Sequence, residues 1–134
     1  MDYLLDTHIL IWFLFNDERL SKEAKDIIEN SKNRIYFSTI NLWEIQIKKD
    51  LYPNFINKSI NNIAVDIMDN GIEPIPFFVR HVYQLETLKI RSRKIKHKDP
   101  FDRALIAQAK ENKMILLTHD SVLKYYKEDC VKIV

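Results

Sequence analysis

Four acidic residues are spaced along the chain so that their carboxylates could act together: Asp6, Glu44, Asp102 and Asp120. Asp6 and Asp120 come shortly after apolar stretches that predict buried strands, while Asp102 and Glu44 fall in the first turns of two predicted helices. In a parallel α/β sheet, the strands end and the helices that follow them begin at one common edge. We therefore expect all four carboxylates at the carboxyl edge of one sheet.

Carboxylates gathered at one edge repel one another unless a cation lies between them. Two unit charges about 4 Å apart repel by about 1 kcal/mol in water and by about 4 kcal/mol at an effective dielectric constant of 20. Mg²⁺ or Mn²⁺ removes this repulsion, prefers oxygen ligands, and keeps water molecules that can be presented to a phosphate. The pattern therefore favours a site for a hard divalent cation.

Each acid taken alone also has a simpler explanation. The segment HKDPFDRALIAQA is typical of a helix start, with Asp99 as the N-cap, proline at the first helical position, and Asp102 beside the positive end of the helix. Asp120 could cap a helix, Asp6 could be a turn residue, and Glu44 could pair with a lysine. The joint pattern of the acids, and not any single one, favours a metal site.

The elements that must position these acids alternate along the chain. Short strands are predicted at 3–5, 34–38, 72–75, 114–118 and 131–134. Helices are predicted at 8–15, 21–31, 38–51, 58–70, 79–88, 100–113 and 121–126. Strands separated by helices indicate an α/β fold with a parallel sheet and right-handed crossovers.

The composition is that of one globular domain covering residues 1–134. A chain of 134 residues, of which 46% are hydrophobic, has enough apolar material for a core. Its single cysteine excludes an intramolecular disulfide. The apolar stretch 9–15 is far shorter than the roughly 20 residues that span a bilayer, and no basic leader precedes it. We expect a cytoplasmic protein without a membrane segment.

A basic stripe, residues 89–98, leads directly into the pair Asp99 and Asp102. It holds six lysines and arginines and no acid, which leaves 15 basic against 19 acidic residues in the rest of the chain. An acidic pocket repels a phosphate-bearing partner, so basic residues beside it would be needed to hold the phosphates. The stripe could instead contact an acidic segment of a protein partner.

Four stretches together resemble the PIN domain, and more narrowly the VapC-type toxin nucleases of prokaryotic toxin–antitoxin pairs: LLDTHILIW, NLWEI, HKDPFDRALIAQA and LLTHD. They occur in the family's order between residues 4 and 120. The resemblance implies a small α/β/α sandwich around a central parallel sheet. It also implies a Mg²⁺- or Mn²⁺-dependent endoribonuclease that forms a homodimer and is held inactive by a cognate antitoxin.

The resemblance also implies roles for the acids. Asp6, Glu44 and Asp102 match the three central acids of the family, and Asp120 matches a fourth, more variable one. Asp6 and Asp102 would hold the principal metal ion, with Asp120 in contact directly or through water. Glu44 would orient or deprotonate the attacking water, or bind a second metal ion. Asp99 is assigned to helix capping, with a supporting role beside the metal.

Several further residues are expected to assist. Thr7 and Thr118 could hydrogen-bond the carboxylates or a metal-bound water, or simply cap their helices. His8 and His119 are expected to orient an acid rather than to bind the metal. Contacts to RNA phosphates are predicted for Arg91, Arg93, Lys94, Lys96, Lys98 and Arg103.

The tryptophans have an expected place as well. Trp12 and Trp43 lie in apolar stretches and are predicted to be core anchors rather than platforms for RNA bases.

Two other classes of protein were weighed against the nuclease. A receiver-like signalling domain is also doubly wound and binds Mg²⁺, but it needs paired acids after the first strand, where LLDTH has only one. A phosphatase with a D-x-D start is excluded because residue 8 is histidine. A non-catalytic PIN module that binds RNA or protein is disfavoured by the retention of all four acids.

Overall fold

The computed structural model describes residues 1–90 and 99–134 and contains one parallel sheet of five strands. The strands are β1 Asp2–Leu5, β2 Arg34–Ser38, β3 Glu73–Ile75, β4 Ile115–Thr118 and β5 Val131–Ile133. They lie in the order β3-β2-β1-β4-β5, so that β1 is the central strand. The α/β fold with a parallel sheet is confirmed.

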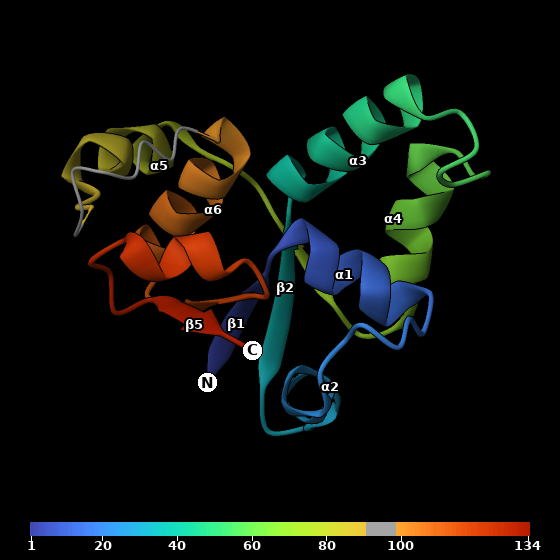
Figure 1. Cartoon of the computed structure of the whole chain (residues 1–134), viewed down its shortest axis with the longest axis horizontal. Coiled ribbons are helices and arrows are strands. Elements are labelled where there is room, and N and C mark those ends of the chain that lie inside the picture. Colours follow the sequence, from blue (N-terminus) through green and yellow to red (C-terminus); the bar gives the residue numbers. More distant parts are fainter. Residues whose placement is uncertain (91–98) are drawn as a thin grey trace.

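Helices connect these strands and cover both faces of the sheet (Figure 1). The α-helices are α1 Thr7–Leu14, α2 Lys22–Glu29, α3 Thr39–Leu51, α4 Ile60–Asp69, α5 Val79–Gln84 and α6 Pro100–Glu111. Two 3-10 helices complete the fold, η1 Leu85–Thr87 and η2 Ser121–Tyr125. None of the helices in the described ranges has the length and apolar character needed to cross a membrane.

Side chains that alternate along the central strands divide the core into two halves. Tyr3 and Leu5 of β1 join Leu117 of β4 in a cluster that α1, α2, α3 and α4 cover. Leu4 and Leu116 point to the opposite face, where α6 packs. Figure 1 shows α5 and α6 on one side of the sheet and α1 to α4 on the other. The fold is therefore an α/β/α sandwich, as the resemblance implied.

The strand order excludes the receiver-like alternative. Flavodoxin-like sheets, to which receiver domains belong, have the order 2-1-3-4-5, in which the first strand pairs with the second and third. Here β1 pairs with β2 and β4, and Tyr3 lies opposite both Ile35 and Ile115.

Two predicted helices differ from the expectation. The helix predicted at 79–88 is divided into α5 and η1, because the Thr87 hydroxyl donates to the Gln84 carbonyl (2.8 Å) and so competes with a regular helical bond. The segment 121–126 forms a 3-10 helix rather than an α-helix. Neither change moves a predicted site residue away from the carboxyl edge of the sheet.

Candidate active site

Each of the four predicted acids lies where a strand ends or where a helix begins. Asp6 is the N-cap of α1, directly after β1, and Asp120 is the N-cap of η2, two residues after β4. Asp102 lies in the first turn of α6, and Glu44 lies in the second turn of α3. Because the strands are all parallel, these positions share the carboxyl edge of the sheet.

Asp6 is the most deeply placed of the acids, since only 3% of its surface is exposed. Its Oδ1 accepts a hydrogen bond from the Thr7 backbone N–H (2.7 Å), and its Oδ2 accepts one from the Thr118 hydroxyl (2.6 Å). Burial raises the pKa of the Asp6 carboxyl, and these two hydrogen bonds offset part of that rise. Thr118 therefore contacts the acid directly.

Asp102 carries the clearest electrostatic sign that the acids converge. Its pKa is raised to about 8, chiefly by burial and further by the negative charges of Asp6, Asp99, Glu44 and Asp120. Such effects weaken steeply with distance and with exposure to water. The five carboxyl groups therefore belong to one electrostatic cluster, which we call the acidic edge.

Glu44 has a buried oxygen that lacks a partner. Among the described residues, its Oε1 has no hydrogen-bond partner although it is shielded from solvent. Burial raises the pKa of Glu44, the Thr7 hydroxyl and the charge of Lys48 lower it, and the charges of Asp6 and Asp99 raise it further. A buried acceptor without a partner is costly, typically by about 1–3 kcal/mol. The position therefore suits a further ligand.

Asn41 is a structural residue of the site that the sequence reasoning missed. Its buried amide nitrogen donates to the Leu5 carbonyl (3.1 Å) and to the Thr7 hydroxyl oxygen (3.0 Å). Its amide oxygen accepts from the Ser38 backbone N–H (2.6 Å). Asn41 thus joins the ends of β1 and β2 and fixes Thr7 beside the acids. The only signal in the sequence is the capping-box spacing of Ser38 and Asn41.

Asp99 caps α6, as predicted. Its Oδ1 accepts hydrogen bonds from the backbone N–H groups of Phe101 (2.9 Å) and Asp102 (3.1 Å), and Pro100 occupies the first helical position. The same carboxylate is part of the acidic edge, because its charge raises the pKa of Asp102. Capping and electrostatic proximity therefore coexist in one residue.

Asp120 also combines a cap with a place at the acidic edge. Its Oδ1 accepts from the Val122 backbone N–H (2.9 Å), and its own N–H donates to the Thr118 hydroxyl oxygen (3.0 Å). The Thr118 hydroxyl in turn donates to Asp6. Thr118 therefore connects the loop after β4 to the acid after β1.

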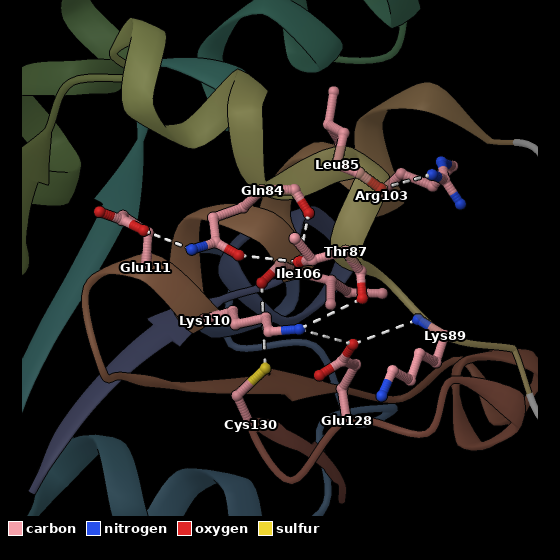
Figure 2. A network of polar contacts seen from close by, with 10 residues as sticks. All are labelled: Gln84, Leu85, Thr87, Lys89, Arg103, Ile106, Lys110, Glu111, Glu128 and Cys130. Atoms are coloured by element: carbon pink, nitrogen blue, oxygen red, sulfur yellow. Dashed lines mark hydrogen bonds and ion pairs between the residues drawn. The ribbon is translucent and has the colours of Figure 1, made fainter.

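Of the residues predicted to contact phosphate, Arg103 lies within the described part of the chain. Its Nη2 donates to the Leu85 carbonyl (3.0 Å), and Figure 2 shows the side chain directed toward η1. In the same view Lys110 and Glu128, an ion pair at 3.1 Å, join α6 to the loop before β5. The other candidates fall outside the described residues: Arg91, Arg93, Lys94, Lys96 and Lys98.

The two tryptophans have different environments. Trp12 is buried and belongs to the core, so that prediction is confirmed. The prediction for Trp43 was wrong, because 59% of its surface is exposed. The buried residues of α3 are Ile40, Asn41 and Ile45, and position 43 lies on a different side of the helix.

The two histidines predicted to assist the acids lie beside one member of the acidic edge, Asp120. His8, Trp12, His119 and Asp120 line a cavity of about 230 Å³. The Trp12 ring lies 5.8 Å from that of His8 and 5.2 Å from that of His119. His8 Nε2 is 3.2 Å from the Lys48 ammonium, and His119 Nδ1 is 2.8 Å from the Val134 carbonyl. Burial and the charge of Lys48 lower the pKa of His8, while the negative charges of Asp6 and Asp120 oppose that shift, so His8 interacts electrostatically with two of the predicted acids.

The donor set suits a hard divalent cation, although its side chains are not drawn together around one point. Within residues 1–90 and 99–134, no three His, Cys, Asp or Glu side chains form a group that could hold a metal ion. Mg²⁺, however, commonly takes only one or two carboxylates and keeps several waters. The unpartnered Glu44 Oε1 and the mutual repulsion that raises the pKa of Asp102 are the features that such an ion would relieve.

Comparison with known proteins agrees with this arrangement. A family model described as the PIN domain matches residues 3–129. No curated protein gives a significant match. Among solved structures, VapBC2 from Rickettsia felis bound to a DNA fragment from its promoter matches with a TM-score of 0.67 and 18% identity. That match covers 100% of this chain and 98% of the other.

Two further solved structures share the fold. A toxin–antitoxin complex from Klebsiella pneumoniae matches with a TM-score of 0.60 and 22% identity, over 97% of this chain and 95% of the other. VapBC-1 from nontypeable Haemophilus influenzae matches with a TM-score of 0.61 and 15% identity, over 93% and 92%. The family match covers nearly the whole sequence, and the chain belongs to the PIN domain family.

Proposed function

We propose that the chain is a Mg²⁺- or Mn²⁺-dependent endoribonuclease and the toxin of a toxin–antitoxin pair. The observation that carries this proposal is the acidic edge, where burial, together with the charges of four other carboxyl groups, raises the pKa of Asp102 to about 8. A carboxyl edge without a cation is electrostatically unfavourable, and PIN domains are generally nucleases. A hydrolytic site that requires a metal ion accounts for both facts.

The residues have distinct roles in this proposal. Asp6 and Asp102 would hold the principal ion, and Asp120 would contact it directly or through water. When bound, the ion would supply charge stabilisation at the phosphate and lower the pKa of water. Glu44 would orient the attacking water and accept its proton, since its Oε1 has no partner among the described residues. In-line attack leaves a 5′-phosphate and a 3′-hydroxyl.

The hydrogen-bonded framework behind the acids supports this assignment. Thr7 and Thr118 are fully buried and fix both oxygens of Asp6. Asn41 holds the Thr7 hydroxyl in place. These hydrogen bonds hold the carboxylates in place before the substrate binds, so the site does not have to rearrange during the reaction.

We also propose that the chain binds an antitoxin and forms a homodimer. The solved structures that share the fold include VapBC and other toxin–antitoxin complexes. Large apolar side chains are exposed at two places. Val65 and Met68 lie on α4, whereas Phe78, Val79, Val82 and Tyr83 lie on α5 or directly before it. Because α4 and α5 lie on opposite faces of the sheet, these side chains form two separate groups, and either group is a candidate surface for a protein partner.

A cleavage assay tests the proposal. The purified chain, free of any partner, would be incubated with total cellular RNA and Mg²⁺ or Mn²⁺, beside an EDTA control. Asp6→Asn and Asp102→Asn remove the proposed ligands, and Asp69→Asn, at the exposed end of α4, is the matched control. We expect discrete cuts with the wild type and Asp69→Asn only. Equal cutting by all variants would contradict the site, and no cutting by any would favour a non-catalytic PIN module.

A further inference from the structure

Trp43 is an exposed indole on α3, one position before Glu44 of the acidic edge. It precedes Glu44 on α3, and 59% of its surface is exposed, although large aromatic side chains are usually well buried. Its ring centroid lies 5.2 Å from that of Phe101, which precedes Asp102 on α6. Two aromatic residues, each adjacent in sequence to a proposed catalytic acid, are therefore in contact across two elements.

The geometry of this contact leaves one face of the indole open. The planes of the two rings are inclined by 89°, so one ring meets the other edge-on. An edge-on neighbour can cover at most one face of Trp43, and the large exposed fraction shows that the remainder is reached by solvent. The backbone of Phe101 is held at the start of α6, because its N–H donates to the Asp99 carboxylate. The pair is a supported aromatic platform.

We propose that Trp43, supported by Phe101, is the stacking platform for an unpaired RNA base next to the scissile phosphate. The inference rests on the proposed nuclease function and assigns Trp43 as a residue that positions the RNA substrate. Aromatic side chains bind the faces of all four bases, so stacking favours unpaired strands without requiring a sequence. A base stacked on Trp43 would carry its phosphate toward Glu44 and Asp102, which are the neighbours of the two rings in sequence.

The negative charge of the acidic edge favours an RNA base, rather than a second copy of the chain, as the group that covers Trp43. A two-fold interface centred on Trp43 would bring the acidic edges of two copies toward each other, because such an interface repeats the same surface on both sides. Facing like charges are unfavourable in an interface. A nucleotide bound together with divalent cations has no such penalty at this position.

Fluorescence gives a direct test, because the chain contains only two tryptophans. Trp12→Phe leaves Trp43 as the sole indole and keeps an aromatic ring in the core. Combined with Asp102→Asn, which removes a proposed metal ligand, this variant would bind RNA without cutting it. It would be titrated in Mg²⁺ with a short single-stranded RNA and with the same sequence as a duplex. We expect saturable quenching of Trp43 emission by the single strand and little change with the duplex.

Affinity measurements on matched variants complete the test. In the Asp102→Asn background, Trp43→Ala is expected to weaken single-strand binding by about 5- to 150-fold, the range of one base–aromatic stack. Trp43→Phe should restore most of the loss. Tyr52→Ala removes an equally exposed aromatic residue, 64% exposed, about 13 Å further along the same helix and should not change binding.

The failure modes are distinguishable. If the wild type cuts RNA while Trp43 emission and the affinity of Trp43→Ala do not change, the stacking inference is wrong and the nuclease proposal stands. If RNA is neither bound nor cut, both proposals fail. If Trp43→Ala instead abolishes self-association in sedimentation while RNA binding is unchanged, a second copy covers the ring and the stacking inference is overturned.

Discussion

At the level of single residues, the behaviour of the acidic edge depends most on Asp102. With a pKa of about 8, its carboxyl group holds a proton at neutral pH when no cation is bound. Asp6 and Glu44 also have raised pKa values, in both cases chiefly because of burial. Binding of a divalent cation would therefore compete with protons, and its affinity would increase with pH.

The metal-free protein should become less stable as the pH rises. An unfolded aspartate has a pKa near 3.9, whereas the folded value for Asp102 is about 8. Between these values the folded state binds more protons than the unfolded state, so the free energy of unfolding falls with increasing pH. Urea unfolding in EDTA at pH 5 and pH 8.5 would measure this fall. Asp102→Asn should reduce it, and an unchanged fall in that variant would refute the assignment.

Asn41 is expected to be important for stability although it carries no charge. Asn41→Ala leaves the Leu5 carbonyl and the Ser38 N–H without their partner, which typically costs about 1–3 kcal/mol in unfolding free energy. Asn61→Ala, on the exposed side of α4, is the matched control and should change stability by no more than about 0.5 kcal/mol. Equal urea midpoints for the two variants would show that Asn41 does not hold the strand ends together.

At the level of elements, the start of α6 carries both a helix cap, Asp99, and a proposed metal ligand, Asp102. Asp99 caps the helix through two backbone N–H groups, and Asp102 follows within the first turn. The positive end of the helix favours negative charge here, so α6 offsets part of the repulsion within the acidic edge.

Two substitutions separate the cap from the charge of Asp99. Asp99→Ala removes the cap and is expected to lower the free energy of unfolding by about 1 kcal/mol. Asp99→Ser keeps a capping oxygen but removes the charge, so it should be as stable as the wild type in EDTA and should retain RNA cleavage. Thermal unfolding and the cleavage assay would measure both properties. If Asp99→Ser loses cleavage as completely as Asp102→Asn, Asp99 is a ligand and not chiefly a cap.

Most helices and strands were predictable, because apolar stretches and helix-capping residues are visible in the local sequence. Apolar stretches such as Tyr3–Leu5 give buried strands, and residues such as Ser21 and Asp99 start helices through their side chains. The four acids could be placed because parallel strands end at one edge. The role of Asn41 could not be predicted, because its hydrogen bonds are to Leu5 and Thr7, which lie 36 and 34 positions earlier in the sequence. Trp43 was misjudged because a polar residue, Asn41, occupies the buried face of α3.

At the level of the whole molecule, the sandwich leaves one edge of the sheet available for chemistry. Helices α1 to α4 cover one face, α5 and α6 cover the other, and the acids lie where α1, α3 and α6 begin (Figure 1). The site is therefore held by elements from both layers. Any ligand that binds several of these acids should stabilise the entire fold, because it adds a further connection between elements of both layers and binds the folded state alone.

Addition of Mn²⁺ should therefore raise the melting temperature of the wild type. A ligand present at 100 times its dissociation constant stabilises the folded state by about 2.7 kcal/mol. Asp102→Asn and Asp6→Asn should show little or no shift, whereas Asp69→Asn should respond as the wild type does. Thermal unfolding followed by circular dichroism would measure these shifts. An equal shift in all variants would indicate that the ion binds elsewhere.

The most direct test of the central claim is the rate at which the purified chain cleaves one mapped RNA site as the Mn²⁺ concentration is varied. We predict a rate that saturates with Mn²⁺, products with a 5′-phosphate, and a loss of at least about 100-fold for Asp102→Asn. Replacing the ribose at the cleavage site by 2′-deoxyribose should leave the bond cleavable, because water and not the 2′-hydroxyl attacks. A rate that is independent of the metal ion, or equal in Asp102→Asn, would contradict a metal-dependent nuclease site at the acidic edge.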